Sequence, residues 1–303
     1  MVRLRTRAPA KVNLVLRVGA ARPDGFHDLE TLFAPLDLAD AVEVEVRPGR
    51  GDVTCRCPGR PDLDGPSNLA ARAALALRRR LGREEAIAIR VTKEVPVTAG
   101  LGGGSSDAAA VLRCLARAFG IRDRALLEEV ALEVGSDVPF FLGRGPAWAE
   151  GRGERLRPAR LRPRHLLLVY PRSPALALRA GEAFRWLDEA RQGRAPRRER
   201  ARANRPENDL MAPCLARRPA LCALAGWLEE LGAASPIMSG SGPTFFGSFP
   251  TRGAALVAAE ALSGRQVGGA GVEAIAARTL TRMPGVSPWK SPRSASSRST
   301  RTS

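Results

Sequence analysis

The sequence predicts a two-domain protein that mixes helices and strands, of the α/β or α+β class. Stretches in which apolar and polar residues alternate, as in half-buried strands, are interleaved with longer stretches of helical spacing. The length of 303 residues suits two domains of ordinary size or one large one. After Gly151 the composition shifts to Arg and Pro, so we predict domains at residues 1–157 and 158–282.

In the first domain, alternation predicts strands at residues 12–18, 41–46 and 87–91. Residues 68–81, rich in Ala, Leu and Arg, have helical spacing. A second helix is predicted at 105–119, because Ser and Asp stand at its start and Gly120 lies just past its end. A third is predicted at 126–134. The passage between the last strand and the second helix is rich in turn-forming residues.

In the second domain, strands are predicted at residues 166–170, 237–239, 244–249 and 272–277, and helices at 183–190, 219–231 and 254–262. From Met283 on the chain is dominated by Ser, Pro and Arg. We therefore predict a disordered basic tail at residues 283–303.

The formal net charge of +17 raises the question of nucleic-acid binding. Much of this charge lies in two segments: residues 191–205 contain seven Arg and one Glu, and residues 282–303 contain five basic residues and no acid. Neither segment interleaves the aromatic residues on which single-stranded bases stack. We interpret the charge as solvated and expect no nucleic-acid partner, but a basic nucleic-acid-binding protein stays open as the alternative.

The cysteines and histidines exclude other classes. Five Cys without a CxxC pair, together with only two His, predict neither a zinc site nor a disulfide framework. The apolar runs are far too short to span a membrane, and the first residues lack the apolar core of a signal peptide. We therefore expect a cytoplasmic protein with no membrane partner and no resident metal cluster.

The strongest local signal is the sequence PVTAGLGGGSSDAAA at residues 96–110. Four glycines in five positions allow backbone N–H groups to turn toward one anion, and the following helix adds its N-terminal N–H groups and dipole. Two serine hydroxyls are available for capping, for a phosphate or for magnesium. We expect a nucleotide to contact Pro96, Ala99, Gly100, Leu101, Gly102, Gly103, Gly104, Ser105 and Ser106.

The common phosphate-loop classes do not fit this segment. No lysine follows the glycines, as the GxxxxGK[ST] loop requires, and Ser105 occupies the last glycine position of the GxGxxG pattern. The HRD and DFG sequences of protein kinases are absent. The loop therefore belongs to another class of nucleotide-binding protein.

Three ordered segments resemble the motifs of the GHMP kinases, which include galactokinase and the homoserine, mevalonate and phosphomevalonate kinases. They are APAKVNL at 8–14, the glycine loop at 100–107 and SGSG at 239–242. More narrowly, RPDGFHDLETL at 22–32, GSDVPF at 135–140 and NDL at 208–210 resemble the branch of this family that phosphorylates a cytidine-linked alcohol. The resemblance extends from about residue 6 to residue 280.

This resemblance implies a first domain like the second domain of ribosomal protein S5, a ferredoxin-like second domain, and an active site between them. It implies transfer of the γ-phosphate of ATP, with Mg²⁺, to the 2-hydroxyl of 4-diphosphocytidyl-2-C-methyl-D-erythritol in non-mevalonate isoprenoid synthesis. Another GHMP kinase, such as homoserine kinase, is the alternative within the family. Oligomeric state does not follow from the sequence.

The resemblance also implies residue roles. Asp137 matches the catalytic aspartate that takes the proton of the substrate hydroxyl, and Lys11 matches the lysine that stabilises the developing charge. The adenine side is implied for Asn68, and substrate contacts are implied for Asn13, Phe26, His27, Phe184, Gly240 and Ser241. The chain departs from the family at 178–180, where Leu-Arg-Ala replaces a Ser-Thr pair, and at Phe26, where tyrosine is more frequent.

Overall fold

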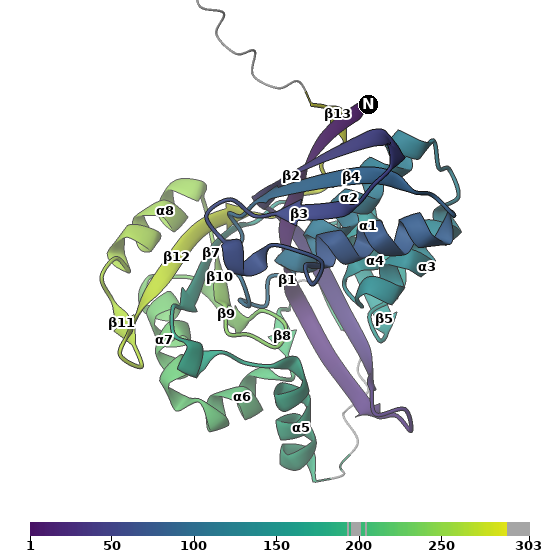
Figure 1. Cartoon of the computed structure of the whole chain (residues 1–303). Helices are drawn as coiled ribbons and strands as arrows, with labels where there is room; N and C mark the ends of the chain where they lie inside the picture. Colours follow the sequence, from purple (N-terminus) through teal and green to yellow (C-terminus); the bar gives the residue numbers. More distant parts are fainter. Residues whose placement is uncertain (193, 195–200, 204, 290–303) are drawn as a thin grey trace, which may run out of the picture.

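The computed structural model describes residues 1–192, 194, 201–203 and 205–289, and contains two β-sheets with helices packed against them (Figure 1). The first sheet has the strand order β13-β1-β2-β4-β3, to which β5, β6 and β8 are attached. Its strands before residue 160 are β1 (Val2–Ala21), β2 (His27–Arg50), β3 (Val53–Arg56), β4 (Glu85–Thr92), β5 (Ala147–Gly151) and β6 (Arg155–Pro158).

The helices of the first domain bury Ala-rich and Leu-rich faces on one another and on this sheet. They are the 3-10 helix η1 (Pro61–Leu63) and the α-helices α1 (Leu69–Arg80), α2 (Gly103–Phe119), α3 (Arg124–Val134) and α4 (Val138–Leu142). In α2 the apolar residues Val111, Leu112 and Leu115 are fully buried. Each such side chain contributes about 1.5–3 kcal/mol relative to an exposed one.

The second sheet is fully antiparallel, with the order β11-β12-β7-β10-β9. Its strands are β7 (His165–Pro171), β9 (Ala234–Met238), β10 (Phe245–Phe249), β11 (Gln266–Val267) and β12 (Ala270–Arg278). The helices of this part are η2 (Pro174–Leu176), α5 (Ala180–Arg191), α6 (Met211–Arg217), η3 (Pro219–Leu221), α7 (Cys222–Glu230) and α8 (Arg252–Ala261). The four longer strands, separated by helices after β7 and after β10, form the β-α-β-β-α-β pattern of a ferredoxin-like domain, which confirms the predicted fold class.

The two sheets share an apolar core at their junction. Ala10, Val12 and Leu14 of β1 are fully buried in one cluster with residues of β7, β10 and β12. Because side chains alternate along a strand, Lys11 and Asn13 point to the opposite face of β1. The short strand β8 (Glu207–Asn208) pairs in parallel with β1 at Val15 and Leu16, so that the second domain also contributes to the first sheet.

The predicted strands at 12–18 and 41–46 are only parts of much longer strands, of 20 and 24 residues. The β1–β2 ladder shifts register between Pro9 and Lys11, between Asn13 and Val15, and between Val18 and Ala21. Such bulges interrupt the alternation on which strand prediction rests. The short elements β3, β5, β6 and α4 were not predicted. The predicted boundary at 157/158 falls at the end of β6, and the second sheet begins at His165.

The predicted disordered tail is wrong for residues 283–289. Met283 and Val286 pack against the first core, the Met283 N–H donates to Arg144 O (2.9 Å), and β13 (Ser287–Pro288) pairs with β1. The open edge of β1 offers hydrogen bonds that this short segment uses despite its composition. Residues 290–303 and most of the Arg-rich run after Arg194 lie outside the described residues. Within the described part of the chain, the longest helices fall short of the length and apolar character needed to cross a membrane.

Candidate functional site

The glycine loop bends sharply before α2. Gly100 and Gly102 have φ values of 77° and 71°, in the left-handed region that favours glycine. A Cβ at Gly100 would lie 2.6 Å from Gly242 O, so this position also requires the close approach that glycine allows. The helix starts at Gly103, two residues before the predicted start, and no side chain of the described residues caps it. Its first N–H groups therefore remain available to an anion.

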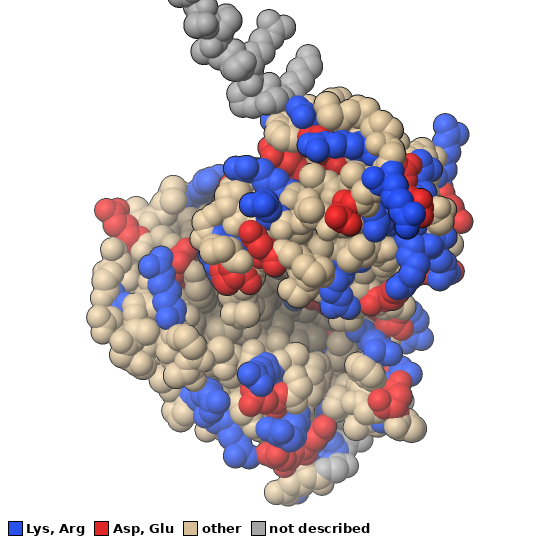
Figure 2. All heavy atoms as spheres, in the orientation of Figure 1, with Lys and Arg blue, Asp and Glu red and all other residues tan. Residues whose placement is uncertain are grey.

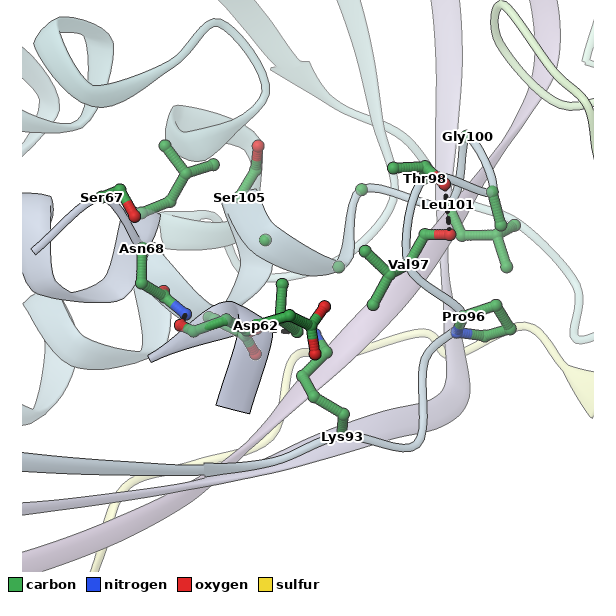
Figure 3. A pocket seen from close by; sticks show the side chains of 17 residues that line it. Asp62, Ser67, Asn68, Lys93, Pro96, Val97, Thr98, Gly100, Leu101 and Ser105 are labelled. Atoms are coloured by element: carbon green, nitrogen blue, oxygen red, sulfur yellow. Dashed lines mark hydrogen bonds and ion pairs between the residues drawn. The ribbon is translucent and has the colours of Figure 1, made fainter. Parts of the chain in front are cut away.

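These N–H groups lie at a pocket of about 390 Å³, which Figure 3 shows between the loop Pro96–Leu101 and the segment Asp62–Asn68. The pocket is lined by all the predicted nucleotide residues except Ser106, whose buried hydroxyl lies just behind it without a hydrogen-bond partner in the described chain. Asn68 is the N-cap of α1: its Oδ1 accepts from Ala70 N and its Nδ2 donates to Leu63 O, both at 2.9 Å. Its side chain thus fixes the wall opposite the loop.

A buried charge cluster lies at the wall of the same pocket, where Lys93 and Asp107 line it. The Lys93 ammonium is 2.5 Å from Asp40 Oδ2 and 2.8 Å from Asp107 Oδ2, so one cation serves two carboxylates. Asp40 Oδ1 accepts from the N–H groups of Glu94 and Val95, whereas Asp107 Oδ1 is buried without a partner among the described residues. Burial raises the pKa of Asp107 to about 8, and the Asp40 charge adds to this against the opposing effect of Lys93.

A second pocket, of about 550 Å³, brings together seven segments of the chain. Figure 2 shows a hollow between the two domains on this face, with basic and acidic side chains interspersed around it. The lining includes every residue predicted to be catalytic or to contact the alcohol substrate, namely Lys11, Asn13, Phe26, His27, Asp137, Phe184, Gly240 and Ser241. The fold therefore brings into one pocket predicted site residues that lie up to 230 positions apart in the sequence.

Lys11 joins the two pockets. Its stem lies against the glycine loop, where a Cβ at Gly102 would be 3.1 Å from its Cγ and Cε, and its N–H donates to Leu101 O (2.9 Å). Its ammonium lies 3.5 Å from Asp137 Oδ2 and donates to Asn13 Oδ1 (2.8 Å). The predicted base and the predicted cation thus lie beside each other, at the end of the phosphate loop.

A chain of buried hydrogen bonds orients Asn13. The Thr31 hydroxyl donates to Val15 O (2.6 Å) and accepts from Asn13 Nδ2 (2.8 Å). Since Asn13 Nδ2 is thereby directed at Thr31, Asn13 Oδ1 faces Lys11. The side chains of Lys11, Asn13 and Thr31, which make these hydrogen bonds, are all buried. The network therefore fixes the position of the Lys11 ammonium at the pocket wall.

The second glycine loop closes over this pair. A Cβ at Gly240 would lie 3.1 Å from Asn13 Oδ1 and 3.5 Å from Lys11 Nζ, and Gly240 has φ 57°. The same loop contacts the first: Thr244 Oγ1 donates to Ala99 O (2.6 Å) and Ser239 Oγ to Gly100 O (3.4 Å). Two glycine-rich loops from different domains are therefore held together at Lys11.

Aromatic residues line the far end of the second pocket. His27 stacks on Phe184, with ring centroids 5.2 Å apart and planes inclined by 20°. His27 Nε2 lies 2.9 Å from Asp188 Oδ1, which favours the tautomer in which Nε2–H donates a hydrogen bond to the carboxylate and Nδ1 is left as an acceptor. Phe26 is 47% exposed, and the Arg152 guanidinium lies 3.5 Å from its ring centroid.

Comparison with known proteins agrees with this geometry. Residues 68–145 match the family model of the GHMP kinases N-terminal domain. A 4-diphosphocytidyl-2-C-methyl-D-erythritol kinase of Anaeromyxobacter dehalogenans (strain 2CP-C) is 65% identical, over 100% of this chain and 99% of that protein. The chain belongs to the 4-diphosphocytidyl-2-C-methyl-D-erythritol kinase family. The family member of Geobacter sulfurreducens is 38% identical over 91% of this chain and 100% of its own length.

Comparison with solved structures supports the same family assignment. A crystal structure of 4-(cytidine 5'-diphospho)-2C-methyl-D-erythritol kinase has a TM-score of 0.72 and 33% identity, over 91% of this chain and 99% of that one. The homoserine kinase of Cytophaga hutchinsonii has a TM-score of 0.64 at 17% identity, over 94% of this chain and 96% of that one, which shows a shared fold alone. This chain is accordingly an ATP-dependent kinase of the GHMP fold.

Several residues of this kinase were not predicted as site residues. Arg152, Asp188 and Thr31 line the second pocket or hold its residues, and Lys93 with Asp107 lies at the first. Lys93 left one signal in the sequence, since only three of the 48 basic residues are lysine. The others are ordinary polar residues whose importance comes from partners distant in the chain.

Proposed function

We propose that this kinase transfers the γ-phosphoryl group of ATP to the 2-hydroxyl of 4-diphosphocytidyl-2-C-methyl-D-erythritol, a step of isoprenoid precursor synthesis. The observation that carries the proposal is the position of Lys11. Its stem lies on the phosphate loop while its ammonium lies beside Asp137, in a pocket whose far wall is aromatic. The donor and the acceptor would thus meet at one cation.

The first pocket would hold the triphosphate. The free N–H groups at the start of α2 and the helix dipole favour phosphate oxygens. Magnesium would fit this site, because it is commonly bound by phosphates, waters and one or two protein oxygens. The buried hydroxyl of Ser106, which has no hydrogen-bond partner among the described residues, would supply such an oxygen beside Ser105. When bound, the ion would offset the negative charge of the phosphates.

Asp137 would accept the proton of the attacking hydroxyl. It lies at the start of α4, and its side chain is about one-third exposed to the pocket, so that a substrate can reach it. Lys11 would stabilise the charge that develops on the transferred group, while Asn13 holds its ammonium in place. Catalysis would therefore rest on positioning and on charge stabilisation, as is usual for phosphoryl transfer.

The aromatic wall would select the cytidine end. A base that bonds edge-on to His27 lies in the plane of the imidazole and therefore nearly parallel to the Phe184 ring. Asp188 leaves His27 Nδ1 as an acceptor, which suits the amino group of cytosine. Phe26 and Arg152 lie on the same pocket and would cover the base.

The test is a coupled assay of ADP formation with three acceptors: 4-diphosphocytidyl-2-C-methyl-D-erythritol, homoserine and mevalonate. We expect turnover with the cytidine substrate alone. Faster turnover with homoserine or mevalonate would overturn the assignment, and nuclear magnetic resonance of the product identifies which hydroxyl carries the phosphate.

A further inference from the structure

Asn208, next to the domain junction, holds the second glycine loop through its side-chain amide nitrogen, while its amide oxygen bonds to its own segment. Its Nδ2 donates to Met238 O and to Gly240 O, both at 2.7 Å, and its Oδ1 accepts from Leu210 N at 2.9 Å. All three contacts are with backbone atoms, so they fix the path of the chain rather than one rotamer. Gly240 is the residue of this loop at which an added Cβ would lie 3.1 Å from Asn13 Oδ1 and 3.5 Å from Lys11 Nζ.

Asp209, the next residue, faces a different element. Its Oδ2 accepts from Val18 N (2.9 Å) and from Arg191 Nη2 (2.8 Å), while Arg191 Nη1 donates to Val18 O (2.8 Å) and Gly19 O (3.1 Å). Arg191 is the last residue of α5, the helix that carries Phe184 and Asp188. Asp209 thus ties the aromatic wall of the pocket to β1.

Both Asn208 and Asp209 are held against β1. The Asp209 N–H donates to Leu16 O (2.9 Å), and Leu16 pairs with Asn208 in the parallel ladder of β8 and β1. The same strand carries Lys11 and Asn13. Two consecutive residues therefore connect one strand to the phosphoryl-transfer end of the pocket on one side and to its cytidine end on the other.

We propose that Asn208 and Asp209 are positioning residues with separate kinetic roles, an inference that rests on the proposed function. Asn208 sets the Gly240 loop against the Lys11–Asn13 pair and acts on the chemical step. Asp209, through Arg191, sets the distance of α5 from β1 and acts on binding of the cytidine end. Neither residue needs to touch the substrate to do so.

Steady-state kinetics with saturating ATP and varied 4-diphosphocytidyl-2-C-methyl-D-erythritol tests this separation. Asn208→Asp keeps the acceptor for Leu210 N but places a carboxylate against two carbonyl oxygens, and Asn208→Ser keeps a shorter cap and loses the two donors. We expect kcat to fall about 10- to 100-fold in both, with KM for the cytidine substrate within about threefold, because small misplacements at a reacting centre act on the chemical step.

Asp209→Asn and Arg191→Lys should show the opposite split. We expect KM for the cytidine substrate to rise about five- to tenfold with kcat within about threefold, since a partly buried charged contact of α5 is weakened. Arg217→Lys is the matched control. Arg217 of α6 also forms an ion pair with α5, at Glu189, but both of these side chains are about half exposed. Its kinetics should stay within about twofold of the wild type.

Thermal unfolding of each variant separates positioning from loss of fold. The inference is overturned if the variants at 208 and 209 change kcat and KM in the same ratio, or if folded variants at both positions retain wild-type kinetics. Wild-type enzyme that fails to phosphorylate the cytidine substrate would instead reject the proposed function.

Discussion

The two pockets of this kinase are built in different ways. The proposed nucleotide pocket is lined by residues from the segments 62–69 and 93–107 of the first domain, and the groups that would bind an anion there are backbone N–H groups. The proposed substrate pocket takes residues from both domains, between Lys11 and Ser241, and several of its polar groups are side chains held by other side chains. A local peptide segment can bind a phosphate, whereas recognition of one alcohol needs an assembled tertiary site.

The largest expected effect is the loss of turnover on substitution of Asp137, which lines the second pocket beside Lys11. Asp137→Asn removes the proposed base while it keeps the size of the side chain. We expect kcat to fall roughly 10²- to 10⁴-fold, the usual contribution of a general base, with little change in ATP affinity. Stopped-assay kinetics and calorimetry measure the two quantities. Turnover near that of the wild type would exclude Asp137 from proton transfer.

The buried cluster of the nucleotide pocket should respond unequally to loss of its charges. Lys93→Met leaves two buried carboxylates facing each other, and we expect the free energy of unfolding to fall by about 3–5 kcal/mol. Asp107→Asn leaves one ammonium with one carboxylate, and we expect no loss or a gain of about 1 kcal/mol. Urea titrations measure both. Equal losses would show that the cluster needs both carboxylates ionised.

The backbone character of the nucleotide pocket can be tested at Gly100. Gly100→Ala adds a Cβ at a positive φ and against Gly242 O, so we expect ATP affinity to fall about tenfold or more. Gly120→Ala is the control, because it has a similar φ of 69° at the other end of α2 and nothing within 4 Å. Calorimetric ATP affinities that agree between the two variants would count against a rigid loop.

The side-chain character of the substrate pocket can be tested at Phe26 and His27. Phe26→Ala should remove about 1–3 kcal/mol of stacking, and His27→Ala a similar amount of hydrogen bonding, on the order of a 5- to 150-fold rise in KM. This rise should be confined to the cytidine substrate, with KM for ATP unchanged. A rise for ATP alone would remove nucleobase recognition from this pocket.

The smallest expected effect is a change in the pKa of Tyr170, a residue of the second domain that lines a pocket together with residues 93–98 of the first domain. Tyr170, the one tyrosine of the chain, donates to Glu273 Oε2 (2.6 Å) on the neighbouring strand. Burial, followed by this carboxylate, holds the pKa of Tyr170 well above its usual range. Ultraviolet titration should show no phenolate at pH 10 in the wild type, and Glu273→Gln should lower the pKa. An unchanged pKa would mean that burial alone is responsible.

The sequence predicts those elements that depend on local residues better than those that depend on contacts between distant residues. The end of helix α2 was predicted correctly from Gly120, whereas its start lies two residues before the Ser and Asp from which it was predicted, because Gly103 and Gly104 already belong to the helix. Strands β1 and β2 were predicted only in part, because three register shifts break their alternation. The composition of residues 283–289 predicted disorder, because the edge of β1 with which they pair is formed by residues distant in the sequence.

By itself the sequence predicted the fold class and a phosphate-binding loop and, through resemblance to a family, the roles proposed for Lys11 and Asp137. Glycine spacing is a local property, so it can be recognised in a linear pattern. Only the tertiary structure decided that Asp188 directs His27, that Thr31 directs Asn13 and that Asn208 holds Gly240. These contacts join residues 18 to 161 positions apart, and the hydrogen bonds that define them exist only once both sheets are assembled.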